Sequence, residues 1–240
     1  FMERERPTCV IHCAALTNLD HCEQNPQEAV LQNAEVPKII AQAAKKTGAE
    51  FIYISTDSVF DGKRGNYTEK DIPHPLNHYA SSKLQGEKNV SAISPDNLIV
   101  RVNIYGWNAM NKQSLAEWIL SQLEKKSPIN GFQDVIFNPL LVNDLSDILI
   151  TMIEKSAKGI FHLGSSDSCS KYEFAVKIAE IFDLDSELVT ASSSDNVALK
   201  TPRPKITTLN TDKIEKELGI KMPSIGQGIK NFYSLREKGV

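Results

Sequence analysis

The chain has 240 residues, of which 41% are hydrophobic and 24% are charged, and its formal net charge is −3 at neutral pH. This length allows one substantial core or two smaller ones, and the small negative charge gives no long-range attraction for nucleic acid or anionic lipid. No apolar run approaches the roughly 18 residues that a membrane span needs, and the first residues do not form a signal peptide.

Strand-like and helix-like segments alternate along the chain. Short apolar runs predict strands at residues 9–14, 51–55, 97–103 and 159–163. Apolar residues at helical spacing predict helices at 26–46, from 77 onward, at 114–125, up to 154, at 170–182, 211–218 and 224–236. This alternation predicts an α/β fold with a parallel sheet wrapped by helices, and a ligand site at the carboxyl ends of the strands.

Several predicted helix ends carry capping residues. Gly48 is placed to end the helix that begins at residue 26, and Asn77 can cap the helix that follows it. Residues 170–173 form a capping box. Asn143 or Asp144 is expected to cap the helix that runs to residue 154.

The four cysteines are scattered, and three of them lie in the first 22 positions. We therefore expect a reduced, cytoplasmic chain with free thiols. A structural zinc site needs two clear ligand pairs, whereas strand alternation places His12 on the face opposite Cys9 and Cys13. The sequence predicts no metal site.

Tyr79 and Lys83 are four residues apart on a predicted helix. Such a pair faces one side of the helix, with Cβ atoms roughly 5–6 Å apart. An ammonium that close can lower the pKa of a phenol, which is normally near about 10, so that the phenol can exchange a proton with a carbonyl or alcohol oxygen. The spacing fits redox chemistry on a hydroxyl or ketone, although by itself it is more typical of an ordinary surface helix with a solvated lysine.

The order of the motifs is more specific than any one of them. Cys13-Ala14-Ala15 closes a strand, Asn33 lies on the next helix, and the following segments come in order: Ser55-Thr56-Asp57, Tyr79 to Lys83, and Arg101-Val-Asn-Ile-Tyr-Gly106. This order resembles the extended short-chain dehydrogenase/reductase family. Within that family the chain is most similar to dTDP-4-dehydrorhamnose reductases, in Tyr53-Ile-Ser-Thr-Asp-Ser-Val-Phe-Asp61, Pro75-Leu-Asn77 and Lys83-Leu-x-Gly-Glu-Lys88.

The resemblance implies a Rossmann-like, doubly wound parallel sheet with a smaller C-terminal lobe. Residues 1–106 and 130–163 are expected to form the dinucleotide-binding part, and 107–129 with 164–240 the substrate-binding lobe. A complete member opens with a Gly-x-x-Gly-x-x-Gly turn at a helix N-terminus, whereas the first glycine here is Gly48. We therefore expect a truncated chain that lacks its first βα units and exposes a sheet edge.

The family roles carry over by position. Tyr79 is expected to give a proton to the substrate oxygen, Lys83 to hold the nicotinamide ribose and tune Tyr79, and Thr56 to hydrogen-bond the same oxygen. The cofactor, NADP or NAD, supplies the hydride. The further cofactor-binding residues are expected to be Ala14, Ala15 and Ser55.

The substrate-binding residues implied by the resemblance are Thr56, Asp57, Ser58, Asn103 and Arg203. Arg203 could pair a nucleotide diphosphate or belong to a solvated loop, and Asn103 could touch the substrate or cap its loop. Close relatives usually carry tyrosine where this chain has Ser58, which leaves the identity of the sugar open.

Asn33 precedes Pro37 by four residues, and proline has no N–H to bond the Asn33 carbonyl. The resemblance implies that this free carbonyl holds a water behind Lys83, which completes a proton path from solvent. The alternative is a kinked packing helix.

The leading functional hypothesis is NAD(P)H-dependent reduction of a nucleotide-linked 4-keto-6-deoxy sugar, as in dTDP-rhamnose biosynthesis. The alternatives are a sugar-nucleotide epimerase or dehydratase, and a regulatory subunit like methionine adenosyltransferase β. A nucleotide sugar is the expected ligand, nucleic acid and membrane are not expected partners, and a homodimer is one assembly that the sequence allows.

Overall fold

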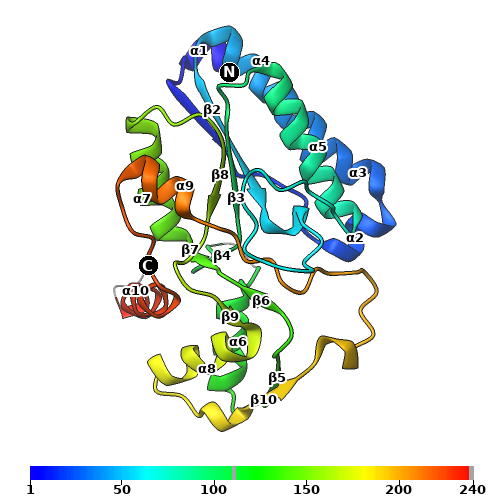
Figure 1. The fold of residues 1–240 in the computed structure, drawn as a ribbon, viewed down its shortest axis with the longest axis vertical. Helices are drawn as coiled ribbons and strands as arrows, with labels where there is room; N and C mark the ends of the chain where they lie inside the picture. Colours follow the sequence, from blue (N-terminus) through cyan, green and yellow to red (C-terminus); the bar gives the residue numbers. More distant parts are fainter. Residues whose placement is uncertain (110–111, 238–240) are drawn as a thin grey trace.

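The computed structural model describes residues 1–109 and 112–237. Its main sheet has four parallel strands in the order β1-β2-β3-β8 (Figure 1). These are β1 (Cys9–His12), β2 (Glu50–Thr56), β3 (Leu98–Val102) and β8 (Gly159–Leu163). The predicted α/β fold with a Rossmann-like parallel sheet is confirmed.

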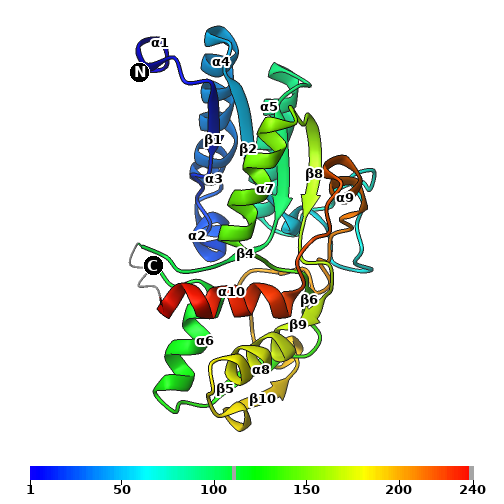
Figure 2. The ribbon, with the colours of Figure 1, turned by 90° about the vertical axis from the view of Figure 1, so that its left-hand side faces the viewer.

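Helices cover both faces of this sheet (Figures 1 and 2). Successive residues of β3 point to opposite faces: Ile99 packs with α4 and α5, whereas Val100 packs with α7 and α9. The first face carries α2 (Leu19–Gln24), α3 (Pro26–Val30), a π-helical turn (Leu31–Glu35), α4 (Val36–Thr47) and α5 (His78–Ile93). The second face carries α7 (Val142–Glu154) and α9 (Asp212–Leu218).

A second hydrophobic core forms the lower lobe in Figure 1. Three helices enclose it: α6 (Leu115–Glu124), α8 (Lys171–Ile181) and α10 (Ile225–Glu237). Its strands pair as β5 (Ile129–Phe132) with β10 (Val189–Ser192), β4 (Ile104–Tyr105) with β7 (Leu140–Leu141), and β6 (Ile136–Phe137) with β9 (Cys169–Ser170). Short helical segments complete the described chain at α1 (Met2–Glu5), Asp57–Val59, Ser186–Leu188 and Ser194–Asn196.

The C-terminal part of the chain does not stay in the lower lobe. Ile214 and Leu218 of α9, with Met222, belong to the core that contains Val100 and Leu145. The expected assignment of all of residues 164–240 to the substrate lobe therefore needs refinement, because this segment returns to the main sheet. The division into two domains otherwise remains a prediction.

The loop of residues 200–210 is bound to the segment of residues 62–67 as it crosses between the two cores. The Ile206 N–H donates to the Gly62 carbonyl, and the Tyr67 N–H donates to the Thr208 carbonyl. Loop 200–210 is therefore fastened to the dinucleotide-binding part by main-chain bonds.

The predicted helix of residues 26–46 is interrupted by the π-helical turn, which ends just before Pro37. Because Pro37 cannot donate to the carbonyl four residues earlier, the backbone widens there. Gly48 ends α4 at a φ of 77°, as predicted. The side chain of Asn77 accepts from the Ala80 N–H (2.9 Å), so the predicted cap of α5 is confirmed.

The capping box at Ser170 and Glu173 is also confirmed. The predicted cap of α7 was wrong: the helix begins at Val142 without a side-chain cap. The Asp144 carboxylate instead accepts a hydrogen bond from Asn231 of α10 (3.2 Å), so tertiary packing has taken the side chain that the sequence assigned to capping.

Strand β1 lies at one edge of the main sheet, and Ile11 on it is 42% exposed. None of the described helices is both long and apolar enough to cross a bilayer.

Candidate active site

Strand β2 and helix α5 bring the three predicted catalytic groups together. Thr56, Tyr79 and Lys83 line one cavity of about 280 Å³ at the carboxyl ends of β2 and β3. Cys13 and Ala15, which follow β1, line the same cavity. In a doubly wound sheet this is the end at which ligands bind, so we name this space the catalytic cavity.

Lys83 is almost completely enclosed, with 1% of its surface exposed. Its ammonium donates to the Ile54 carbonyl (2.7 Å) and lies 4.0 Å from the centroid of the Tyr53 ring. Burial lowers the pKa of Lys83 to about 7, although the nearby Glu87 carboxylate acts in the opposite direction. Lys83 can therefore change its charge near neutral pH.

Tyr79 is half-buried beside Thr56. Burial raises its pKa to about 12, a side-chain hydrogen bond with Thr56 opposes the rise, and the charge of Asp57 adds to it. The Lys83 ammonium is turned toward the Ile54 carbonyl. The net shift of the Tyr79 pKa is upward because burial outweighs the other contributions, whereas the sequence predicted a lowered pKa.

Asp57 is buried (2% exposed) and accepts several hydrogen bonds. Its carboxylate accepts from Thr56 (3.1 Å) and from Ser58 (3.2 Å) on its own segment. It also accepts from the Asn103 amide (2.9 Å) and the Thr207 hydroxyl (2.7 Å). Asp57 therefore ties the end of β2 to loop 200–210, while Asp57, Ser58 and Asn103 still line the catalytic cavity.

Ser55 was predicted to contact the cofactor, and it does contribute to the lining of the catalytic cavity. Its hydroxyl, however, donates to the Glu87 carboxylate at 2.5 Å, and the residue is 5% exposed. The side chain is thus directed toward the core between β2 and α5.

Asn33 is buried in the π-helical turn. Its carbonyl accepts a hydrogen bond from the Tyr53 hydroxyl (2.7 Å), a partner that the sequence did not predict, and the water path through this carbonyl stays a prediction. A Cβ on Gly86 would lie 2.2 Å from this carbonyl oxygen, so α5 can approach only with glycine there. The Asn33 side chain bonds both the N–H (2.8 Å) and the carbonyl (3.0 Å) of Leu16, and so fixes the loop after β1.

Of the two alanines expected at the cofactor, Ala15 lines the catalytic cavity, whereas Ala14 is exposed beside it. The cysteines nearby carry free thiols: Cys13 is exposed and Cys22 is buried. In residues 1–109 and 112–237, no three His, Cys, Asp or Glu side chains are grouped in a way that could hold a metal ion.

A second cavity, of about 190 Å³, opens from the first, and we name it the lobe cavity. The two share four lining residues: Leu19, Asp57, Ser58 and Asn103. The remaining lining comes mainly from the lower lobe and loop 200–210, with Phe132, Val135, Phe137, Lys171, Ser194, Leu199, Arg203, Pro204, Lys205 and Thr207. The two cavities together form a single cleft between the main sheet and the lobe.

Lys171 was not identified as a site residue from the sequence. It is the first residue of α8, and its pKa is lowered by burial and then by the charge of Arg203. Lys205 differs, because Asp134 (2.8 Å) and Asp195 (2.7 Å) both pair with it. The lobe cavity thus holds two neighbouring cations, Lys171 and Arg203, which an anion between them would stabilise. The sequence signal was only a lysine directly after a capping serine.

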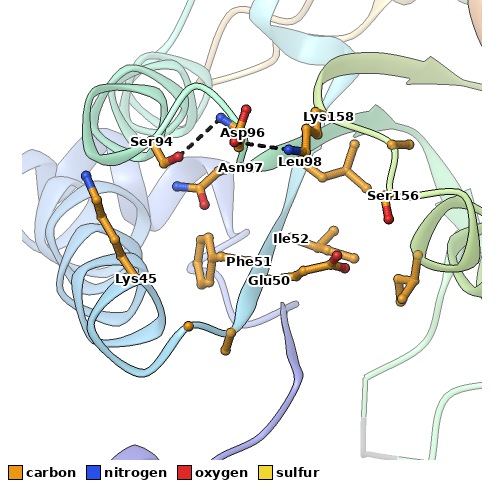
Figure 3. Close-up of a pocket in the computed structure, with 14 residues that line it drawn as sticks. Lys45, Glu50, Phe51, Ile52, Ser94, Asp96, Asn97, Leu98, Ser156 and Lys158 are labelled. Carbon is orange, nitrogen blue, oxygen red and sulfur yellow. Dashed lines mark hydrogen bonds and ion pairs between the residues drawn. The ribbon is translucent and has the colours of Figure 1, made fainter.

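Another cavity, of about 260 Å³, lies at the opposite end of the main sheet (Figure 3). Three of its charged groups already have partners: Lys158 pairs with Asp96 (3.1 Å), and Lys45 donates to the Ile93 carbonyl (2.7 Å), whereas Glu50 also lines the cavity. It lies at the amino ends of β2 and β3, remote from Tyr79. We therefore assign the candidate active site to the cleft formed by the catalytic and lobe cavities.

A parallel α/β sheet with a tyrosine, a lysine and a threonine around a cavity at its carboxyl end defines an extended short-chain dehydrogenase/reductase-like protein. Residues 1–237 match the family model described as the RmlD substrate binding domain, and the chain belongs to this family. The resemblance expected from the sequence is thereby confirmed.

Three curated relatives are about one third identical to this chain over the aligned segments. A probable low-salt glycan biosynthesis reductase of Haloferax volcanii is 31% identical over 220 residues, which cover 90% of this chain and 73% of the relative. A spore coat polysaccharide biosynthesis protein of Bacillus subtilis is 33% identical over 218 residues, covering 90% and 75%. Methionine adenosyltransferase 2 subunit beta of Xenopus laevis is 32% identical over 220 residues, covering 88% of this chain and 65% of the relative.

Solved structures agree with this assignment. The dTDP-4-dehydrorhamnose reductase of Bacillus anthracis, in complex with NADP, superposes with a TM-score of 0.91 at 30% identity, covering 98% of this chain and 83% of that one. An orthologue from Clostridium acetobutylicum gives a TM-score of 0.91 at 29% identity, covering 99% and 84%. The UDP-glucose 4-epimerase of Thermotoga maritima, at 19% identity and a TM-score of 0.83, shares the fold.

Proposed function

We propose that this chain carries the active site of an NAD(P)H-dependent reductase that acts on a nucleotide-linked 4-keto-6-deoxy sugar. The observation that carries the proposal is the pair of adjoining cavities: Thr56, Tyr79 and Lys83 line one, Lys171 and Arg203 line the other, and four lining residues belong to both. The similarity to reductases of glycan and dTDP-rhamnose synthesis supports the same assignment.

The catalytic cavity fits the nicotinamide end of NADP or NAD. Lys83 and Tyr79 offer an amine and a phenol to the ribose, and Ala15 leaves space beside them. The sequence supplies no glycine-rich turn for the diphosphate before Gly48, so we propose cofactor contacts only for the nicotinamide end. When bound, the reduced nicotinamide supplies the hydride that adds to the carbonyl carbon.

The residues of this chain would then handle the carbonyl oxygen. Tyr79 gives its proton to that oxygen as the hydride reaches the carbon, which yields an alcohol and a tyrosinate. The Thr56 hydroxyl hydrogen-bonds the same oxygen and holds it against Tyr79. Because the pKa of Tyr79 is raised to about 12, the phenol stays protonated at neutral pH until the developing alkoxide accepts its proton.

The lobe cavity would hold the nucleotide side of the substrate. Lys171 and Arg203 place two positive charges where a diphosphate could lie between them. Ser58 and Asn103 stand at the junction of the two cavities, where the sugar would pass. The small Ser58 side chain would leave room for a ring substituent at this point.

A second candidate is a binding subunit without turnover, because methionine adenosyltransferase 2 subunit beta of Rattus norvegicus is 33% identical over 224 residues. An epimerase or dehydratase has less support, since Asp57 is followed by Ser58 rather than by a second acid, and the epimerase and dehydratase neighbours are only 19% identical.

The experiment is a turnover assay with NADPH and a dTDP-linked 4-keto-6-deoxy sugar, followed by the loss of reduced-cofactor absorbance. The reductase proposal predicts substrate-dependent oxidation of NADPH. Cofactor binding without oxidation at saturating sugar nucleotide would instead support the binding-subunit candidate.

A further inference from the structure

One face of α5 carries three functional side chains in a row. Tyr79, Lys83 and Glu87 are each four residues apart, so they lie on the same side of the helix. This face is turned toward β2, and both Lys83 and Glu87 are buried, at 1% and 3% exposure. The sequence analysis used the first two residues of the row and left Glu87 without a role.

Each member of the row interacts with one of the last three residues of β2. Thr56 hydrogen-bonds Tyr79, the Ile54 carbonyl accepts from Lys83 at 2.7 Å, and the Ser55 hydroxyl donates to Glu87 at 2.5 Å. The same strand end that holds the two proposed catalytic groups therefore also holds Glu87.

The Glu87 carboxylate is fixed from the opposite side by Arg101 of β3. The guanidinium forms two close contacts with it, Nε to Oε1 at 3.0 Å and Nη2 to Oε2 at 2.7 Å. His162 lies beyond Arg101, with its Nε2 3.3 Å from Arg101 Nη1, and its pKa is lowered to about 3 by burial and by Arg101. His162 is thus neutral, and Arg101 is the cation that pairs with Glu87.

The surroundings of Lys83 hold few other charges. From β1 and the residue after it, His12 and Cys13 face Lys83; burial and Lys83 lower the His12 pKa, and burial raises the Cys13 pKa, so both groups are uncharged at neutral pH. From β2, Tyr53 is a neutral phenol whose ring lies under the ammonium. Tyr79, on the same helix, is also protonated. Glu87 is the carboxylate that acts on Lys83.

We propose that Glu87, fixed by Ser55 and Arg101, is a positioning residue whose buried carboxylate keeps the Lys83 side chain charged in the catalytic cavity. A buried ammonium loses its hydration, and a fixed negative charge one helical turn away offsets part of that loss. The consequence for catalysis rests on the proposed function, because a charged Lys83 is what would hold the nicotinamide ribose at neutral pH.

The test is the apparent pKa of Lys83, measured without turnover. An NMR titration of the full chain labelled with carbon-13 at lysine Cε, from about pH 5 to about pH 9, follows the charge of Lys83 through its Cε chemical shift and needs no reagent to reach the enclosed amine. Glu87→Gln should move this midpoint down by about one pH unit, since a neighbouring charge typically shifts a pKa by about that much or more. Glu87→Asp, which keeps the charge, should restore most of the shift.

A matched control removes a carboxylate from the far end of the same network. Glu69 accepts a hydrogen bond from the His162 N–H (2.9 Å), so Glu69→Gln disturbs the network without touching Glu87. The Lys83 midpoint should stay unchanged in this variant. If Glu87→Gln fails to fold, the double variant Glu87→Met/Arg101→Met removes the ion pair as a whole, and it should lower the midpoint in the same direction.

A Lys83 midpoint that is equal in wild type, Glu87→Gln and the double variant would overturn the proposal and leave Glu87 a purely structural residue. Because the NMR titration needs neither cofactor nor substrate, a chain without reductase activity can still show the shift. Failure of the proposed function is therefore distinguishable from failure of this inference.

Discussion

The two ends of the cleft are built in different ways. At the catalytic end, Thr56 and Lys83 sit on a strand and a helix that pack together in the core of the main sheet. At the other end, Arg203 lies on loop 200–210, which is held by main-chain bonds to residues 62–67 and by side-chain bonds such as Thr207 to Asp57 (2.7 Å), and Lys171 begins helix α8. The proposed catalytic groups and the proposed anion-binding groups thus lie on separate elements, so mutations at the two ends should affect different kinetic constants.

The largest effect is expected at the catalytic end. Tyr79→Phe removes the proton proposed for the substrate oxygen, and it should lower kcat by about 10²–10⁴-fold. The dissociation constant of NADPH should rise by no more than about tenfold, because the variant loses one hydrogen bond to the ribose while Lys83 keeps its contacts with Ile54 and Tyr53. Steady-state kinetics measures kcat, and cofactor fluorescence measures the dissociation constant of NADPH. If kcat and the affinity for NADPH fell by equal factors, Tyr79 would not be the proton donor.

Mutations in the lobe cavity should act on binding. Lys171→Gln and Arg203→Gln should each raise KM about tenfold with kcat nearly unchanged, since a charged hydrogen bond contributes about 1.5–3 kcal/mol. Lys177→Gln, which makes the same charge change on α8 outside the cavity lining, is the control. If kcat fell while KM stayed unaltered, the substrate diphosphate would not bind between Lys171 and Arg203.

The hydrogen bond from Thr207 to Asp57 links the two ends of the cleft, and a single substitution can remove it. Thr207→Val removes one of the donors to the buried Asp57 carboxylate, so it should lower the free energy of unfolding by about 1–3 kcal/mol. KM should rise as well, because loop 200–210 carries Arg203. Denaturant melts of Thr207→Val and of the exposed control Thr190→Val would compare the two sites, and equal stabilities would show that the link is dispensable.

The last predicted effect is a pH dependence of stability. Burial lowers the pKa of Lys83 to about 7, so the unfolded chain binds more protons at this group than the folded chain between about pH 7 and about pH 10.4. The stability contributed by Lys83 therefore rises with pH across this window and is lowest below pH 7. Denaturant melts of wild type and Lys83→Met should diverge accordingly, and parallel pH profiles would contradict the lowered pKa.

Much of the main sheet could be predicted from the sequence because its signals are local. Buried parallel strands appear as short apolar runs, and the caps at Gly48, Asn77 and Ser170 need only neighbouring residues. The misplaced cap at Asp144 had a local reason too, but the carboxylate bonds Asn231, which is far away in sequence.

The catalytic cavity was predictable as a set of residues but not as a set of contacts. The spacing of Tyr79 and Lys83 placed them on one face of α5, yet it could not show that the Lys83 ammonium turns to the Ile54 carbonyl. Nor could it show that Ser55 bonds Glu87 across the strand–helix interface. Lys171 was missed because it meets Arg203 only when two distant segments fold against each other.

The most direct test of the central claim follows the hydride. NADPH deuterated at the transferred position of the nicotinamide C4 would be mixed with the protein and a dTDP-linked 4-keto-6-deoxy sugar, and the sugar product would be examined by NMR. The account predicts deuterium at C4 of the sugar with wild type, and little or none with Tyr79→Phe in the same time. Bound NADPH and intact keto sugar with wild-type protein would contradict it.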